Sequence, residues 1–374
     1  MEDLDLHGAG RVNLFLPNPT KHGTCPINWA VRWSAPTNFN NAMNNTHVLL
    51  LPILCLFSAS LSLAADKPAP DPRETYSTNG WALAWSEEFD KDGLVDTNTW
   101  AYEVGFVRNH EPQYYTRARE ENCVVKDGVL TITARKETWQ NEDYLKQKSG
   151  WKYSVKEAKY TSADITTRRT FLFGRLEIRA QLPATQGSWP AIWTLGDSLR
   201  KPKDDPEYWN WPCSGEIDIV EVWGHNPNRI AACLHTAKDG YKQKANEHHT
   251  VIGGGDRHFS KPGEGPGEGF HTYTLDWYED RILFFYDGIR YGSATLSRSD
   301  WPDGSNPFRK PHYLLLNLAL GGYGNKVVDV DTPEMKKTKD ADGKEIEVPT
   351  GKIIPAAQFP MEMKVDWVRY YTHE

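Results

Sequence analysis

The sequence predicts an all-β fold, a sandwich of two antiparallel sheets. Short apolar or alternating runs recur between clusters of Gly, Pro, Asn and Asp, and long stretches with helical periodicity are missing. That combination is typical of β-sandwiches, in which short strands of alternating pattern are separated by frequent turns. The clearest strands are expected at 129–134, 175–180, 282–286, 313–318 and 363–371.

The connections between the runs also carry information. The Asp-Gly pair at 287–288 separates two β-forming runs, and such a pair predicts a tight hairpin. Longer loops are expected at 197–211, 237–269 and 329–355. The second loop contains three consecutive glycines at 253–255. Because their spacing differs from a phosphate-binding fingerprint, they predict a flexible loop.

Composition argues against some classes of function and favours others. The 374 residues carry a net charge of −7 without a basic footprint, which argues against nucleic acid or an anionic membrane as partner. Apolar residues make up 39% of the chain, enough for one large core. The 15 Trp and 17 Tyr residues offer flat rings with polar edges, which suit sugar rings, although most of them are expected in the core.

The amino-terminal segment is expected to be absent from the working protein. An apolar, Leu-rich run at 48–63 ends in a small-x-small cleavage pattern, which predicts a signal peptide at 43–65. Met43 is then the first residue, and 1–42 is a non-native upstream extension. The run is short for a membrane-anchoring helix, the alternative. The mature domain is expected at 66–374, secreted or periplasmic and without membrane contact.

Five cysteines are present, and Cys25 and Cys55 precede the mature domain. Cys123, Cys213 and Cys233 remain, so at most one disulfide can form among them. No pair of these cysteines has metal-ligand spacing. Cys123 and Cys233 are expected as buried thiols on strands, and the pairing of Cys213 stays open.

The most informative segment is 215–221, where three carboxylates stand inside a run of Ile and Val. Side chains alternate along a strand, so Glu216 and Asp218 share one face. Glu221 falls on the other face unless one extra residue is bulged out, and bulges often lie beside active sites. With the bulge, three like charges crowd one patch of sheet and raise the pKa of at least one carboxyl group.

A carboxylic acid with a raised pKa beside an ionised carboxylate can hydrolyse a glycosidic bond. In the retaining reaction the two groups stand about 5–5.5 Å apart, one as nucleophile and the other as acid and then base. The alternative is an exposed edge strand with solvated acids. The tryptophan-containing segments 189–193 and 223–224, on either side of the motif, favour the catalytic interpretation.

Eight segments follow one another in a defined order. They are WSEEFD at 85–90, QYYT at 113–116, DGVLTITA at 127–134, GSWPAIW at 187–193, GEIDIVE at 215–221, FHTY at 270–273, YLLLNLALGG at 313–322 and VDWVRYY at 365–371. Together they resemble glycoside hydrolase family 16, the laminarinase-like β-glucanases and their relatives, over most of the chain. The resemblance implies a jelly roll of two stacked antiparallel sheets, with the concave sheet forming the substrate cleft.

The resemblance also implies a role for each carboxylate. Glu216 matches the nucleophile that attacks the anomeric carbon. Glu221 matches the general acid that protonates the leaving oxygen and then activates water. Asp218 would hydrogen-bond the nucleophile and help to set which group keeps the proton. No cofactor for catalysis is implied.

Substrate-binding residues are implied on neighbouring strands. Trp189 and Trp193 match positions along the sugar-binding floor. His235, on the strand after the motif, would contact the bound sugar or tune the carboxylate cluster, and a purely structural role is the alternative. Trp223 departs from the family, in which many relatives carry Tyr.

A polar loop is implied on the non-reducing side of the cleft. Asn109 and Glu111 match that loop in laminarinase-like members. The family usually reads Asn-Asn-Glu-Leu-Gln there, so Arg108, His110 and Pro112 depart from the pattern.

Relatives also hold a calcium ion far from the cleft, using backbone oxygens and one Asp near the last strand. The matching positions are Glu88, Gly128 and Asp366. Oxygen ligands suit such a hard cation. The ion would stabilise the fold and take no part in the chemistry, and a surface strand acid is the alternative for Asp366.

The expected function is that of a secreted, retaining endo-glycosidase for internal β-1,3 or β-1,3/1,4 bonds of glucans such as laminarin. The expected partner is the polysaccharide alone, and the protein is expected to be a monomer. A marine galactanase of the agarase, porphyranase or carrageenase type is the main alternative, with Arg200, Lys201, Lys203 and Arg229 as its basic residues. Transglycosylation stays open, whereas a non-catalytic carbohydrate-binding sandwich needs no carboxylate triad.

Overall fold

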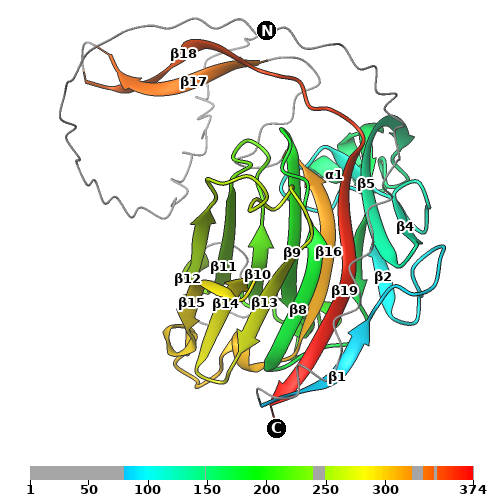
Figure 1. Cartoon of the computed structure of the whole chain (residues 1–374), viewed down its shortest axis with the longest axis vertical. Coiled ribbons are helices and arrows are strands. Elements are labelled where there is room, and N and C mark those ends of the chain that lie inside the picture. Colours follow the sequence, from blue (N-terminus) through cyan, green and yellow to red (C-terminus); the bar gives the residue numbers. More distant parts are fainter. Residues whose placement is uncertain (1–79, 148, 239–248, 322–331, 341–342, 374) are drawn as a thin grey trace, which may run out of the picture. The chain divides into compact units, whose positions relative to one another are not determined.

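The structure of the protein is a computed structural model, which describes residues 80–147, 149–238, 249–321, 332–340 and 343–373 (Figure 1). The predictions on 1–42, on the signal peptide at 43–65 and on Cys25 and Cys55 lie outside these residues. The described chain consists mainly of strands, with one four-residue α-helix, α1 (Trp151–Ser154), and short 3-10 turns. No helix in this part is long and apolar enough to span a membrane.

One layer of the sandwich, the β19 sheet, is arranged around the last strand. Its strands are β1 (Trp81–Glu87), β4 (Cys123–Lys126), β5 (Val129–Gln140), β8 (Gly174–Gln181), β13 (His271–Trp277), β14 (Arg281–Tyr286), β15 (Ile289–Thr295) and β19 (Met361–His373). β19 pairs on one side with β8 and on the other with β5 and then β1. β13, β14 and β15 continue the layer beyond β8.

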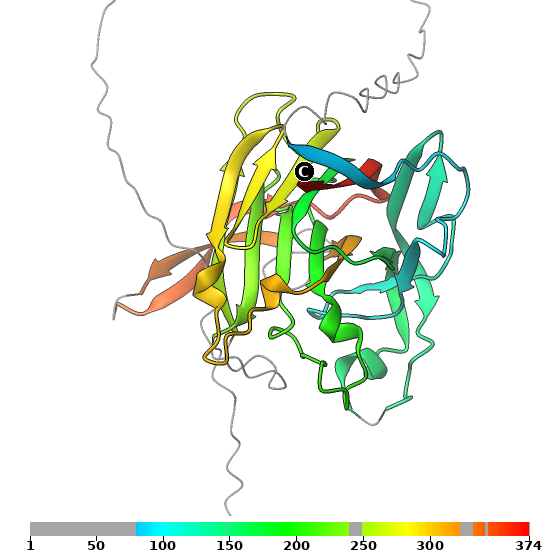
Figure 2. The same cartoon turned by 90° about the horizontal axis from the view of Figure 1, so that it is seen from below.

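The second layer, the β10 sheet, carries the carboxylate motif. Its strands in spatial order are β2 (Trp100–Glu103), β7 (Asp164–Thr167), β16 (His312–Leu320), β9 (Ser188–Gly196), β10 (Glu216–Glu221), β11 (Arg229–Ala237) and β12 (His249–His258). All of these pairs are antiparallel. Figure 1 shows the strands of both layers running side by side, and Figure 2 shows them from below.

The two layers are joined at both edges. At one edge, β12 pairs with β15 through Gly254–Ser293 and Gly255–Gly292. At the other, β5 leaves β19 and pairs with β6 (Glu157–Ser162), which runs on into β7. The short strand β3 (Gln113–Tyr115) pairs with β6 in parallel. The hydrogen-bonded ladder therefore passes through 17 strands.

Apolar side chains from both layers fill the space between them. Ile217 and Ile219 of β10 meet Leu176 and Ile178 of β8 there, each at 2% exposure or less. Because side chains alternate along a strand, the other face of the β10 sheet is left for polar groups. The predicted sandwich is confirmed, and the five predicted strands lie within β5, β8, β14, β16 and β19.

Two of the predicted loops are wrong. The segment 237–269 contains β12, and 329–355 contains a hairpin of β17 (Thr332–Lys339) and β18 (Glu345–Ile354). The third, 197–211, has only the 3-10 turn η3 (Asp197–Arg200) in regular structure. The predicted hairpin at Asp287-Gly288 is confirmed, because these two residues connect β14 and β15.

The glycines of β12 allow close approach of neighbouring strands. A Cβ atom on Gly253 would lie 2.5 Å from the Cβ of Ala294, and one on Gly255 would lie 2.1 Å from the carbonyl oxygen of Tyr291. Real Cβ atoms do not approach other atoms so closely. The prediction of a flexible loop here is wrong, because these glycines let β12 reach β15 at the closed edge.

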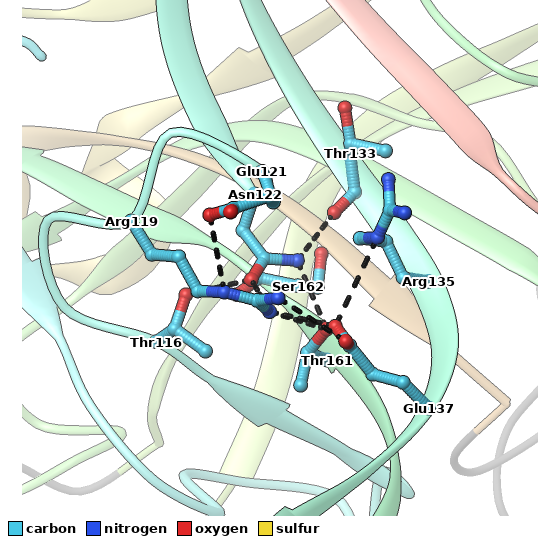
Figure 3. A network of polar contacts seen from close by, with 9 residues as sticks. All are labelled: Thr116, Arg119, Glu121, Asn122, Thr133, Arg135, Glu137, Thr161 and Ser162. Carbon is cyan, nitrogen blue, oxygen red and sulfur yellow. Dashed lines mark hydrogen bonds and ion pairs between the residues drawn. The ribbon is translucent and has the colours of Figure 1, made fainter.

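A network of polar side chains stabilises the region in which β5 passes from one layer to the other (Figure 3). Arg119 donates from Nη1 and Nη2 to the two carboxylate oxygens of Glu137, at 2.6 and 3.1 Å. The fully buried Asn122 donates to the Thr133 carbonyl and the Thr161 hydroxyl, at 2.9 and 3.0 Å. These bonds tie the segment before β4 to β5 and β6.

Cys123, Cys213 and Cys233 form no disulfide with one another. Cys123 and Cys213 are buried, and Cys233 is partly exposed on β11. The prediction of a buried strand thiol is confirmed for Cys123 and is wrong for Cys233.

Candidate active site

β10 contains the bulge that the sequence predicts. Its register with β11 is regular from Glu216 to Asp218 and shifts before Glu221, and its register with β9 shifts in the same stretch. Ile219 and Val220, the two residues within the shift, both belong to the buried core. The three carboxylates consequently share the opposite face of the β10 sheet.

The backbone of the bulge is held from the other layer. Tyr291 of β15 donates its hydroxyl to the carbonyl oxygen of Ile219. A bulge disrupts the ladder locally, and a buried carbonyl without a partner is unfavourable. Tyr291 supplies that partner, so the β19 sheet contributes to the shape of the carboxylate patch.

Each of two glutamates accepts a hydrogen bond from an indole. Trp211, in the loop before β10, donates from Nε1 to Glu216 Oε2 at 2.8 Å. Trp189, at the start of β9, donates from Nε1 to Glu221 Oε1 at 3.0 Å. Each bond occupies one carboxylate oxygen and fixes the direction of the other.

A histidine lies against the central carboxylate. His235 Nε2 lies 3.1 Å from Asp218 Oδ2 and 3.8 Å from Glu216 Oε1. Asp218 is 4% exposed, so its charge has little access to water. Sequence analysis left His235 between a role in the cluster and a structural role, and the structure places its ring in the cluster.

The surroundings raise the pKa values of two carboxyl groups. Burial is the main cause and the negative charge of Asp218 is the second, so that the pKa of Glu216 rises to about 7 and that of Glu221 to about 8. For His235, burial disfavours the charged ring. The bonds to Asp218 and Cys233 and the nearby carboxylates outweigh it and raise the pKa well above its ordinary value.

These groups can supply a proton and a negative charge at the same place. Glu221 has the higher pKa and is the better candidate to hold a proton near neutral pH. Glu216 ionises at a lower pH than Glu221 and is the better candidate for the charged partner. An acid beside an ionised carboxylate has the chemistry to cleave a glycosidic bond.

The two predicted floor tryptophans lie on the same face of β9, because its pairing with β16 is regular. Trp189 is partly exposed, and the ring of Trp223 lies 6.4 Å from it. Trp193 is 6% exposed and donates from Nε1 to Asn317 Oδ1 at 2.7 Å. The guanidinium of Arg108 lies 4.8 Å from the centre of a Trp193 ring, so Trp189 has the more accessible ring.

The predicted polar loop is tied into the protein by its own side chains. Asn109 donates to Glu111 Oε1 at 3.1 Å, and Gln113 donates to Glu111 Oε2 at 2.8 Å. Glu111 is 3% exposed. The hydroxyl of Tyr115 lies between Glu111 and Asn317. Asn317 also accepts the hydrogen bond from the indole of Trp193. Contact of Asn109 and Glu111 with a sugar stays a prediction.

Sequence reasoning flagged Arg108 as a departure from the family but did not give its role. Arg108 ion-pairs with Glu103 of β2 and, at 2.9 Å, with Asp164 of β7. Trp211 and His249, which also line the carboxylate patch, were not singled out. Trp211 belongs to the loop that leads into β10, and His249 belongs to β12, in a segment that was expected to be a loop.

A pocket of about 460 Å³ lies on the same face of the β10 sheet, farther along it. Its lining residues come from β2, β7, η3, β16 and the segment after β7: Ala101, Glu103, Thr166, Arg168, Leu199, Arg200 and Tyr313. The guanidinium of Arg200 lies 3.4 Å from the ring centre of Tyr313. This pocket lies over strands on the β2 side of the carboxylates.

The three predicted calcium positions converge on one stretch of β19. Val365 of β19 pairs with Leu130 just after Gly128, and Val368 pairs with Glu87 just before Glu88. Asp366 lies between these two pairs. Its carboxylate accepts from Arg179 at 2.5 Å, and that of Glu88 accepts two bonds from Arg369 at 3.1 Å. Both carboxylates are paired with arginines, so calcium at these positions stays a prediction.

The β-sandwich presents a carboxyl group that holds a proton and an ionisable carboxylate on one sheet face. These are the groups that a glycoside hydrolase needs for catalysis. The family described as "Glycosyl hydrolases family 16" matches residues 110–340. The chain therefore belongs to glycoside hydrolase family 16.

Known proteins resemble the chain over most of the described region. The β-glucanase of Rhodothermus marinus is 35% identical over 302 residues, 78% of this chain and 85% of that protein. The laminarinase catalytic domain of Thermotoga maritima MSB8 has 30% identity and a TM-score of 0.57, over 79% of this chain and 99% of that one. A structure from work on endo-acting O-glycanases of human gut microbiota that initiate mucin breakdown has 32% identity and a TM-score of 0.63, over 79% and 92%.

Proposed function

We propose that the protein is a secreted or periplasmic, monomeric endo-hydrolase of β-1,3-glucan of the laminarin type, and that it retains the anomeric configuration. The observation that carries the proposal is the bulged β10, which presents Glu216, Asp218 and Glu221 on one face. Similarity to a β-glucanase and to a laminarinase supports glucan as the substrate.

The first step forms a covalent glycosyl-enzyme. Trp211 holds Glu216 Oε2, which leaves Oε1 to attack the anomeric carbon. Glu221 gives its proton to the leaving oxygen as the glycosidic bond breaks. In the second step Glu221 takes a proton from water, and the water oxygen attacks the same carbon and releases Glu216. Two inversions at one carbon give a β product.

The substrate chain is proposed to lie across the strands of the β10 sheet. The partly exposed Trp189 offers a ring on which a sugar can stack next to the acid. β16 and β7, which line the distal pocket, are the second and third strands from β10, about 10 and 14 Å away at a strand spacing of about 4.8 Å. A polysaccharide chain that is long enough to contact both Trp189 and the distal pocket is expected to be cut at an internal bond.

An anionic galactan is the second candidate, because Arg168 and Arg200 line the distal pocket. Three of the basic residues considered for this role face acids. Arg200 lies 3.9 Å from Asp197, Lys201 lies 3.4 Å from Glu207, and Arg229 lies 3.1 Å from Asp256. Glucan is therefore the better-supported substrate.

The test is hydrolysis of laminarin, lichenan, agarose, carrageenan and mucin-type O-glycans, with product analysis. We expect laminarin to be cut internally, with the β anomer as the first product in proton NMR. Initial α anomer contradicts retention. Inert laminarin with rapid cleavage of agarose, carrageenan or O-glycans keeps the mechanism and overturns the substrate, and longer products than the starting chains indicate transglycosylation.

A matched variant ties any activity to the carboxylate patch. Glu216→Gln keeps the shape of the side chain but removes the attacking charge. We expect hydrolysis to fall by orders of magnitude while circular dichroism and the melting temperature stay close to those of the wild type. Unaltered hydrolysis by this variant contradicts the assignment of the nucleophile.

A further inference from the structure

A second histidine extends the carboxylate patch toward solvent. His249, the first residue of β12, is exposed, and its Nε2 lies 2.7 Å from Nδ1 of His235. Nε2 of His235 in turn lies 3.1 Å from Asp218 Oδ2. An ion-pair contact and one hydrogen bond between ring nitrogens therefore link the three side chains from the buried carboxylate to the surface.

The two imidazole rings meet edge to edge. Their planes differ by 11° and their centres lie 4.9 Å apart, while the nearest nitrogens lie 2.7 Å apart. Rings stacked face to face keep van der Waals separation, so a nitrogen distance this short requires the rings to lie nearly in one plane. The ring of Trp211 packs on His249 at 5.2 Å with an angle of 29° and supports this orientation.

Only some protonation states fit this arrangement. A hydrogen bond between two ring nitrogens needs one N–H and one lone pair, and a charged imidazole has no lone pair to offer. His235 in its charged state donates from Nε2 to Asp218 and from Nδ1 to His249. His249 must then be neutral and accept at Nε2, so the pair carries no more than one positive charge.

We propose that His249 is a positioning residue of the hydrolysis. It accepts a hydrogen bond from His235 and so keeps the His235 ring charged. The charged ring in turn favours the ionised states of Asp218 and Glu216. This inference rests on the proposed function. Among the groups that face His249 are His235 on β11, the carboxylates of β10 behind it and the uncharged Trp211.

The charge of His235 acts on both glutamates. It lowers the pKa of Glu216 and that of Glu221 against the effect of burial. Loss of the acceptor at His249 makes the charged ring less favourable, and the pKa values of both glutamates then rise. The acidic limb of the pH profile of kcat/KM reports ionisation of Glu216 in the free enzyme, and the basic limb reports that of Glu221. Both limbs are therefore expected to move to higher pH together.

The experiment compares three variants on one substrate. His249→Phe keeps a ring against Trp211 but removes the acceptor, and His249→Gln keeps an acceptor oxygen. His258→Phe makes the same replacement at an exposed histidine of the same strand, which lies 3.1 Å from Asp256. We expect both limbs to shift upward by about one pH unit in His249→Phe, the size of one hydrogen bond to a charged group. His249→Gln is expected to restore most of that shift, and His258→Phe to show none.

A substrate-free measurement separates this inference from the proposed function. NMR titration of the His235 ring is expected to show a lower pKa in His249→Phe than in the wild type. Unchanged limbs with an unchanged His235 titration overturn the inference, and so do equal shifts in the Phe and Gln variants. If the wild type cleaves none of the polysaccharides, the proposed function fails, and the titration alone decides the role of His249.

Discussion

The three carboxylates of β10 occupy six residues of one strand, yet each has a different neighbour. An indole from the preceding loop holds Glu216, an imidazole from β11 faces Asp218, and an indole from β9 holds Glu221. Glu216 and Glu221 thereby acquire different affinities for protons. Their separate roles come from these neighbours rather than from their own chemistry.

The pH dependence of activity follows from the raised pKa values. Glu216 must be ionised to attack, so kcat/KM is expected to fall as pH decreases below about 7. Glu221 must be protonated to assist the leaving group, so kcat/KM is expected to fall as pH increases above about 8. A bell-shaped profile with its maximum between these values is the expected result, and an optimum near pH 4–5 contradicts the raised pKa values.

Removal of the acid has a diagnostic signature. Glu221→Ala is expected to cripple hydrolysis of glucan far more than that of an activated aryl glycoside, whose leaving group needs little protonation. Azide is expected to rescue the activated substrate with a β-azide product, because a small anion can replace the missing base. The measurement is product analysis by NMR. An α-azide product, or equal losses for both substrates, contradicts the role.

At the scale of single residues, the sequence predicted the reactive carboxylates better than it predicted the side chains that contact them. Alternation along a strand was enough to predict the bulge, because it requires only the spacing of Glu216, Asp218 and Glu221. The contact of Trp211 depends on how the loop before β10 turns back over the strand, and that of His249 on how β12 packs beside β11, and no local pattern encodes either arrangement. Arg108 was noticed only because it departs from the family.

At the scale of elements, β12 is one of the strands that sequence patterns did not find. Glycines are depleted in strands, so Gly253, Gly254 and Gly255 predict a loop. In the structure they let β12 pair with β11 on one side and with β15 on the other. The requirement for glycine comes from strand packing, which becomes visible only when both neighbours are in place.

The steric requirement at β12 can be tested by matched substitutions. Gly253→Ala places a Cβ 2.5 Å from Ala294 Cβ, and we expect it to lower the free energy of unfolding by about 1–3 kcal/mol. Gly269→Ala is the control, because its nearest neighbour atom lies 3.9 Å away and no positive φ is involved. The control is expected to be neutral or slightly stabilising in urea denaturation. Equal effects of both substitutions contradict close packing at Gly253.

At the scale of the whole molecule, the sandwich was predictable because it rests on repeated local patterns. Its strand order and its closed edges were not, since they depend on pairings between segments far apart in the chain. The network of Arg119, Asn122 and Glu137 illustrates the point, because it ties the segment before β4 to β5 and β6 (Figure 3).

The calcium proposal belongs to this scale, because the positions join three separate segments. We propose that main-chain oxygens near Glu88, Gly128 and Asp366 hold the ion, since both carboxylates pair with arginines. Removal of the ion with EDTA is expected to lower the melting temperature by several degrees, and added calcium to restore it, with kcat/KM unchanged at 25 °C. An unchanged melting temperature contradicts the site.

The hydroxyl of Tyr291 reaches the bulge from the layer opposite the carboxylate face. The spacing of the carboxylates along β10 is therefore stabilised by a residue that the exposed face does not contain. Substitutions along the exposed face can alter which sugar chain is accepted while the spacing of the carboxylates is kept. Such a separation allows a lineage to acquire new substrates without rebuilding its chemistry.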